Sequence, residues 1–199
     1  PAKAKRDDDK LIILFPGSLS WHQGVDIAIE AFKQVHAEFP NSEFHIYGDG
    51  ITIGELKTQA KDAGFNGSVR FFKPRGLREI AKIMADADLG VVPKRADSFG
   101  NEAYSTKIME FMSVGVPVVI SSTKIDRYYF DDSVVRFFES GDSDGLARQM
   151  IDLLSNRQER QAMVERALDY AEKNCWETRK VDYLKIADSL CEEAIAGTN

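Results

Sequence analysis

Residues 93–117 concentrate side chains that could bind an anion. Their sequence, PKRADSFGNEAYSTKIMEFMSVGVP, is a polar loop that runs into a helix whose first turn holds Ser105, Thr106 and Lys107. At such a helix start, a phosphate can meet hydroxyl groups, free backbone N–H groups, the positive end of the helix and an ammonium together. The sequence therefore predicts a phosphate site at these three residues.

Two glutamates accompany this predicted site. Glu102 lies in the loop before the helix, and Glu110 lies eight positions later, about a turn inside it. A carboxylate beside a phosphate site can accept hydrogen bonds from vicinal hydroxyls, as an acidic residue does for a ribose. One glutamate is predicted to bind a ribose and the other a sugar. Two glutamates without this loop would be interpreted as partners in surface salt bridges.

A second polar turn, residues 17–24 (GSLSWHQG), follows the first apolar run. It has neither the G-x-G-x-x-G of a dinucleotide site nor a P-loop motif, so it does not favour either kind of protein. Its backbone N–H groups can still approach a phosphate, or it can be an ordinary strand-to-helix turn. The candidate ligand-binding residues here are Gly17, Ser18, His22 and Gln23, and for His22 a plain loop role remains open.

The rest of the chain must position these groups, and it alternates short apolar runs with helical periods. Strands are predicted at 11–15, 43–47, 69–72, 89–92 and 117–120, with 134–138 as a candidate sixth strand. Helices are predicted at 25–39, 51–63, 80–87 and 108–114, and further helices from about 142 at 146–154, 158–174 and 176–196. This rhythm is typical of an α/β fold with a doubly wound, Rossmann-like parallel sheet, here with extra C-terminal helices.

In an open α/β sheet, ligands bind outside the carboxyl ends of the strands. The candidate loops are therefore 16–24, 48–51, 73–77, 93–107 and 121–129. Four basic residues lie near two of these strand ends and could add positive charge to a phosphate site, or could be solvated surface charges. They are Arg75, Arg78, Lys94 and Arg95.

Composition limits the kind of protein. With 199 residues, 43% of them hydrophobic, the chain can form one sizeable core, and its net charge of −6 argues against a nucleic-acid binder with a basic face. The two cysteines, Cys175 and Cys191, show neither metal-ligand nor disulfide-framework spacing, which favours a cytoplasmic protein. No apolar run approaches the roughly 18 residues of a membrane span. The charged start, residues 1–10, is interpreted as a linker in a chain cut from something longer, and residues 11–199 as the domain.

Residues 11–119, and more weakly the C-terminal helices, resemble the donor-binding domain of family 4 (group 1) retaining glycosyltransferases, which have the two-domain GT-B fold. That family carries a Glu-x7-Glu signature followed by a small residue, Gly, Pro and two apolar residues. Glu102, Glu110 and residues 114–119 (VGVPVV) match it. GSLSWHQGVDIAIEAF and HIYGDG are similar to two further family segments.

The resemblance implies a nucleotide-diphosphate-sugar donor, with Glu110 on the ribose hydroxyls and Glu102, as a catalytic residue, near the donor sugar. It places the diphosphate on backbone amides of Ser105, Thr106 and Lys107. The loop of residues 73–77, including Arg75 and Leu77, would meet the base. In such enzymes the acceptor attacks on the leaving-group face and the donor phosphate helps to take the proton. Positive charge eases departure of the diphosphate.

The sequence departs from the family pattern in two places. Many members have an Arg and a Lys on the diphosphate where this chain has Ser18 and Gln23. The usual Phe-Gly after the first Glu is also absent, and Phe99-Gly100 lies before Glu102 instead. Either activity is lost, or Lys107, as a second catalytic residue, supplies the charge together with His22, Lys94 or Arg95. The intact polar loop favours the second interpretation.

The predicted function is donor binding in a retaining glycosyltransferase that uses a UDP-, GDP- or dTDP-linked sugar and neither metal nor cofactor. The expected partners are a missing N-terminal acceptor domain and a sugar or lipid-linked acceptor, with the longer enzyme in the cytoplasm or peripherally at the inner face of the membrane. The alternatives are a sugar-nucleotide epimerase and a non-catalytic nucleotide-binding module. Asp86-Ala87-Asp88 has the D-x-D form of metal-dependent enzymes, but it falls where a predicted helix ends and a strand begins, the wrong edge of the sheet.

Overall fold

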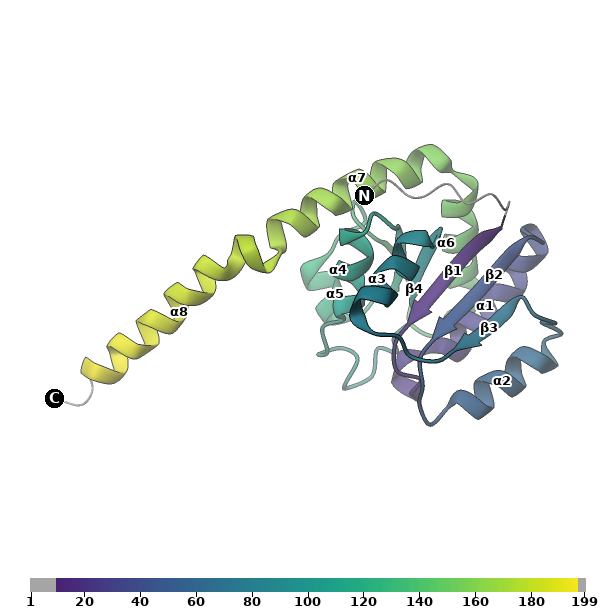
Figure 1. Cartoon of the computed structure of the whole chain (residues 1–199), viewed down its shortest axis with the longest axis horizontal. Coiled ribbons are helices and arrows are strands. Elements are labelled where there is room, and N and C mark those ends of the chain that lie inside the picture. Colours follow the sequence, from purple (N-terminus) through teal and green to yellow (C-terminus); the bar gives the residue numbers. More distant parts are fainter. Residues whose placement is uncertain (1–9, 197–199) are drawn as a thin grey trace.

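A six-stranded parallel sheet, in the order β3-β2-β1-β4-β5-β6, runs through the centre of the structure (Figure 1). The computed structural model describes residues 10–196, with side chains as far as residue 191. The strands are β1 (Leu11–Pro16), β2 (Ser42–Tyr47), β3 (Val69–Phe72), β4 (Leu89–Val92), β5 (Val118–Ser121) and β6 (Arg136–Phe138). This order reverses direction between β1 and β4, and that is the topological switch point of a doubly wound sheet. The predicted fold class is confirmed.

The apolar runs form these strands because the middle of the sheet is covered on both faces. Every residue of β4 (LGVV) and β5 (VVIS) is buried, and so is β1 after its first residue. Continuous apolar runs of this kind are what a parallel sheet with two covered faces requires.

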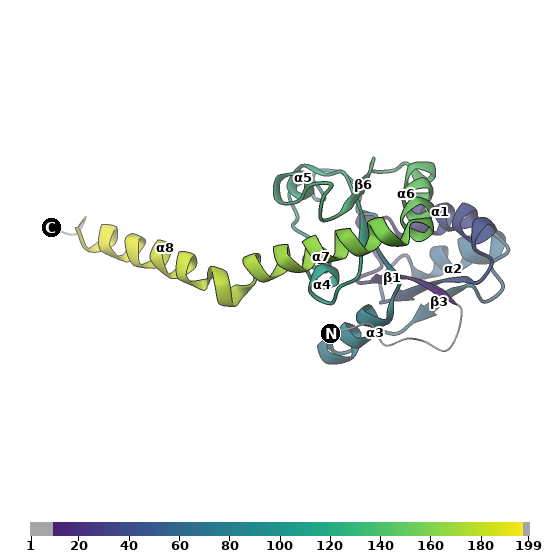
Figure 2. The ribbon, with the colours of Figure 1, turned by 90° about the horizontal axis from the view of Figure 1, so that it is seen from above.

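Helices cover both faces of the sheet (Figures 1 and 2). The helices are the 3-10 turn η1 (Trp21–Gln23), α1 (Val25–Glu38), α2 (Ile53–Asp62), α3 (Leu77–Asp86), α4 (Thr106–Ser113), α5 (Lys124–Tyr129), α6 (Ser143–Ser155), α7 (Arg157–Asn174) and α8 (Trp176–Ala196). Apolar side chains of α1, α2 and α6 pack on one face and those of α3 and α4 on the other, and α7 contributes Met163 to the first core cluster and Ala167 and Ala171 to the second.

The predicted elements are present, several of them with shifted ends, and two further elements appear. The prediction of a loop at 121–129 was wrong in part, since α5 begins at Lys124. Its N-cap, Thr123, accepts a hydrogen bond from the backbone N–H of Asp126. With six residues, α5 is too short to show a helical period in the sequence. The three residues of η1, inside the polar turn, are missed for the same reason.

Helix α8 extends away from the rest of the structure (Figures 1 and 2). More than half of the surface of several of its apolar side chains is exposed. They are Trp176, Val181, Tyr183, Leu184, Ile186 and Leu190. Within residues 10–196, no helix combines the length and the apolar character that crossing a membrane demands.

Candidate functional site

The loops after β1 and β4 lie against each other at the switch point. Gly24, the residue before α1, has a φ of 64°, and a Cβ on it would lie 2.0 Å from the carbonyl oxygen of Pro93. Two residues beyond Pro93, the Arg95 N–H donates to the carbonyl oxygen of His22 at 2.9 Å. The backbones of the two candidate loops are therefore held in direct contact, as predicted for loops at one sheet edge.

A cavity of about 280 Å³ opens at this edge and joins residues from several loops. It is lined by Pro16, Gly17, Ser18, Tyr47, Gly48, Asp49, Pro74, Arg75, Ile80 and Glu110. Four of the predicted donor-binding residues line it: Gly17, Ser18, Arg75 and Glu110. Glu110 comes from inside α4, so the cavity links the polar turn after β1 to the helix that was predicted to bind phosphate.

Lys107 reaches from the first turn of α4 toward the same turn. Its Nζ donates to Oε1 of Gln23 at 2.9 Å and lies 3.2 Å from the position that a Cβ on Gly17 would occupy. Burial lowers the pKa of the Lys107 ammonium, and the nearby carboxylate of Glu110 opposes this effect. A partly buried ammonium thus lies between the turn after β1 and Glu110, where an anion could pair with it.

The start of α4 offers a further hydrogen-bonding group. Ser105, the N-cap, is buried, and no side-chain hydrogen bond caps this end of the helix. Its Oγ has no hydrogen-bond partner within the described part of the chain. Buried polar atoms normally have partners, so an unpaired hydroxyl at a helix N-terminus suits a ligand that brings oxygen atoms to it. Thr106 is exposed beside it.

Seven predicted site residues do not line this cavity. Four of them lie at the polar turn and the start of α4: Gln23, Ser105, Thr106 and Lys107. The other three lie elsewhere. Glu102 is exposed in the turn before α4, and its backbone N–H donates to the carbonyl oxygen of Phe99 at 3.1 Å. Leu77 begins α3 and is 78% exposed. His22 is exposed, and its Nδ1 lies 2.5 Å from Oδ2 of Asp97. The structure does not bring these three side chains to the group formed by Gly17, Lys107 and Glu110.

Two of the other candidate cations have buried or close carboxylate partners. Arg95 makes two hydrogen bonds to the carboxylate of Asp26, at 2.9 and 2.6 Å, and Lys94 pairs with the buried Asp126 at 3.0 Å. By contrast, Arg75 lines the cavity and Lys107 lies beside it, against Gln23.

Sequence reasoning missed Tyr47 as a site residue. Its ring stacks on Phe72, with centroids 4.4 Å apart and planes 12° apart, and burial raises the pKa of its hydroxyl. Tyr47 is the last residue of β2, so the rule that strand ends bind ligands could have drawn attention to it.

The alternative of a metal site at Asp86-Ala87-Asp88 is disfavoured by the position of Asp88. Asp88 precedes β4, and its Oδ2 accepts the backbone N–H of Ile12 at 2.8 Å, at the amino end of β1. Asp88 thus bonds at the sheet edge opposite the cavity. Among the described side chains, no group of three or more His, Cys, Asp or Glu residues could hold a metal ion.

Replacing Gly48 with alanine is expected to reduce the free energy of unfolding by about 1–3 kcal/mol. A Cβ on Gly48 would lie 1.8 Å from the carbonyl oxygen of Gly17, so the loops after β1 and β2 would have to move apart. Urea denaturation measures the change. Gly54→Ala is the matched control, because nothing lies within 4 Å of its added Cβ. Equal midpoints for the two variants would contradict the close approach.

Comparison with known proteins agrees with the fold. A phosphatidyl-myo-inositol mannosyltransferase from Mycolicibacterium smegmatis is 27% identical over 169 residues, which are 84% of this chain and 42% of that protein. Among solved structures, Anabaena Alr3699/HepE in complex with UDP and glucose superposes with a TM-score of 0.80 at 22% identity, over 92% of this chain and 49% of that one. The C-terminal domain of LpcC, a group 1 glycosyl transferase from Francisella tularensis, superposes with a TM-score of 0.72 at 19% identity. It is matched over 85% of its length and 83% of this chain.

The two structural likenesses show the fold, and the chain spans less than half the length of the curated mannosyltransferase. The family model for glycosyl transferases group 1 matches residues 1–169. This match favours the glycosyltransferase interpretation over the epimerase and the non-catalytic module. The chain belongs to the group 1 glycosyl transferases.

Proposed function

We propose that this chain is the donor-binding domain of a retaining glycosyltransferase, which transfers a sugar from a nucleotide-diphosphate-sugar to a glycan or lipid-linked acceptor. The observation that carries the proposal is the cavity at the switch point, where Gly17, Ser18 and Glu110 meet, with Lys107 beside them. A UDP complex is known for the similarly folded HepE, which supports a nucleotide ligand.

Each part of the donor has a group of residues suited to it. Glu110 binds the ribose hydroxyls, and Arg75 lies at the side of the cavity that receives the base. The diphosphate lies between the turn after β1, with Gly17, Ser18 and Gln23, and the start of α4, with Ser105, Thr106 and Lys107. Glu102, His22 and Leu77 remain proposed contacts, with Glu102 at the donor sugar.

In the proposed reaction, the bond between the sugar C1 and the diphosphate oxygen breaks, and an acceptor oxygen bonds to C1 on the same face. The acceptor proton passes to the departing diphosphate oxygen, so no separate base is required. The negative charge on the leaving group increases as the C1–O bond breaks, and the Lys107 ammonium stabilises it. Neither a metal nor an organic cofactor takes part in this scheme.

A further domain is part of the proposal, with residues 11–199 as the donor-binding unit. Helix α8 exposes Trp176, Tyr183 and Leu190 at successive seven-residue intervals, and each is at least 60% exposed. Large apolar side chains in such a row favour a covering partner. An N-terminal acceptor domain, together with the sugar or lipid-linked acceptor that it binds, is the proposed partner. The whole enzyme is proposed to act in the cytoplasm, with peripheral contact at the inner face of a membrane.

Lys107→Ala is expected to weaken UDP or GDP binding about tenfold while changing the affinity for the matching nucleoside less than twofold. A charge that acts on a diphosphate has no target on a nucleoside. Calorimetry with UDP, GDP, dTDP and ADP first identifies the nucleotide that binds, and the variant is then compared with that nucleotide and its nucleoside.

Lys124→Ala, which removes an exposed ammonium at the start of α5, is the control and should leave both affinities unchanged. Equal losses for diphosphate and nucleoside would show that Lys107 is structural. No binding of any of the four diphosphates to the unaltered chain would contradict the proposed function itself.

A further inference from the structure

Lys94 is a buried cation that the proposed donor contacts do not use. It lies two residues beyond the end of β4 and is 3% exposed. Its Nζ is 3.0 Å from Oδ2 of Asp126 and donates to the carbonyl oxygen of Ala103 at 2.7 Å. The ammonium thus connects the first part of the loop between β4 and α4 to the last part.

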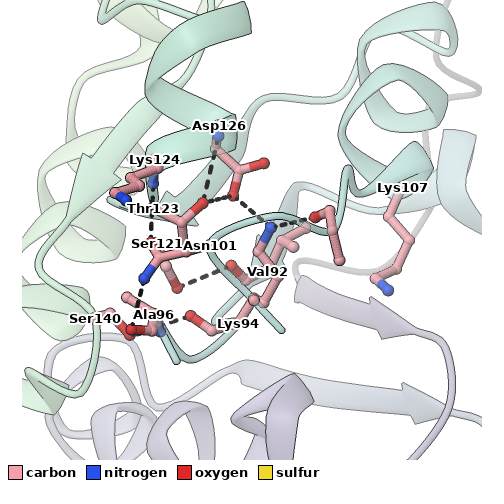
Figure 3. Close-up of polar contacts among 12 residues, drawn as sticks. Val92, Lys94, Ala96, Asn101, Lys107, Ser121, Thr123, Lys124, Asp126 and Ser140 are labelled. Atoms are coloured by element: carbon pink, nitrogen blue, oxygen red, sulfur yellow. Dashed lines mark hydrogen bonds and ion pairs between the residues drawn. The ribbon is translucent and has the colours of Figure 1, made fainter. Parts of the chain in front are cut away.

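Asp126 is fully buried in α5 and completes this contact (Figure 3). Its Oδ2 also accepts a hydrogen bond from the hydroxyl of Thr123 at 2.7 Å. Burying two opposite charges adds little net stability, because removing both from water offsets most of their attraction. Stability alone is therefore a weak reason for this pair.

The same loop is fixed to its surroundings at other points (Figure 3). The Lys124 N–H donates to Oδ1 of Asn101 at 3.0 Å, and Ser140 Oγ accepts the N–H of Ala96 at 2.8 Å. These bonds hold residues 96 and 101. The bond from Lys94 to Ala103 is different, because it holds the backbone two residues before the α4 N-cap Ser105.

We propose that Lys94 and Asp126 are positioning residues for the diphosphate site. Lys94 holds the Ala103 carbonyl, and Asp126 holds Lys94, so the backbone that leads into α4 presents its N–H groups and the Ser105 hydroxyl in one fixed arrangement. Because the charge of Asp126 offsets that of Lys94, Lys94 acts by holding the backbone in place and not as a charge on the diphosphate. The inference rests on the proposed function, because it requires a diphosphate at the start of α4.

The test replaces the whole pair by apolar residues of similar size, Lys94→Met with Asp126→Leu. Such a replacement of a buried ion pair often preserves folding, whereas removing one partner leaves an unpaired buried charge. The thermal midpoint should stay near that of the unaltered chain. The affinity for UDP should fall about fivefold to tenfold, and the affinity for uridine should change less than twofold. Arg127→Ala, which removes an exposed cation of α5 paired with Asp132, is the control and should change neither affinity.

A folded double variant with unchanged UDP affinity would overturn the inference. If Lys107→Ala still weakens UDP binding in that case, the proposed function stands and only the positioning role fails. If Lys107→Ala has no effect either, the diphosphate site is misplaced and both fail.

A second variant decides the question if the double variant does not fold. Lys94→Gln with Asp126→Asn removes both charges, so no buried charge is left unpaired, and it keeps a donor at residue 94 for the carbonyl oxygen of Ala103. Positioning predicts UDP affinity within threefold of the unaltered chain. If Lys94 instead acted directly as a charge on the diphosphate, removing its ammonium would weaken UDP binding by more than threefold and leave uridine binding unchanged, and that result would overturn the inference.

Discussion

Replacing Glu110 with alanine is expected to lower the affinity for the nucleoside diphosphate more than tenfold and to leave the fold intact. Glu110 lines the cavity together with Ser18 and Arg75, and its carboxylate is the proposed acceptor for both ribose hydroxyls. Losing a charged acceptor costs about 1.5–3 kcal/mol, which corresponds to roughly a tenfold or larger increase in dissociation constant. Calorimetry with the best nucleotide measures the change, and circular dichroism checks the fold.

The effect of this variant should differ in kind from that of Lys107→Ala. The ribose is present in both nucleoside and diphosphate, so Glu110→Ala should weaken the two ligands by similar factors. Glu55→Ala, which removes an exposed carboxylate on α2, is the matched control and should have no effect. Unchanged affinity for Glu110→Ala would contradict the ribose assignment, and a loss confined to the diphosphate would place Glu110 beside the phosphates instead.

The 199-residue chain is expected to bind the donor nucleotide and yet transfer no sugar to an added acceptor. Holding two reactants together in attacking geometry contributes on the order of 7–11 kcal/mol of barrier reduction in well-oriented cases. In the proposed function, this chain holds the donor alone. Donor hydrolysis should also be slow, because in the proposed function the acceptor domain is what closes the donor site and holds a reactant against the sugar.

The measurement is a product assay with radiolabelled donor and a range of sugar and lipid-linked acceptors. A chain extended before Pro1 to the full length of the enzyme is tested in parallel and should be active. Robust transfer by the short chain would show that it contains an acceptor site, and the proposal of a separate acceptor domain would then be wrong.

Local patterns in the sequence were sufficient for the fold class. The runs at 11–15, 89–92 and 117–120 are apolar without interruption, as strands covered on both faces of a sheet require. The spacing of Lys107 and Glu110, three positions apart at the start of one helix, likewise places both side chains near the same face. Short elements escaped this reasoning, because the three residues of η1 and the six of α5 do not complete a recognisable period.

Only the tertiary structure decided which charged groups remain available for a ligand. In the sequence, Lys94, Arg95 and Lys107 are all cations in or beside one polar loop. In the fold, Lys94 pairs with Asp126 and Arg95 with Asp26, a residue 69 positions away, whereas Lys107 lies against Gln23 beside the cavity. Local sequence patterns extend over a few residues, but ion pairs form between side chains that the sheet brings together from distant segments. The sequence by itself therefore determined the sheet, its ligand-binding edge and the candidate residues. The packing of α1, α4 and α5 around that edge determined which of the candidate residues face the cavity.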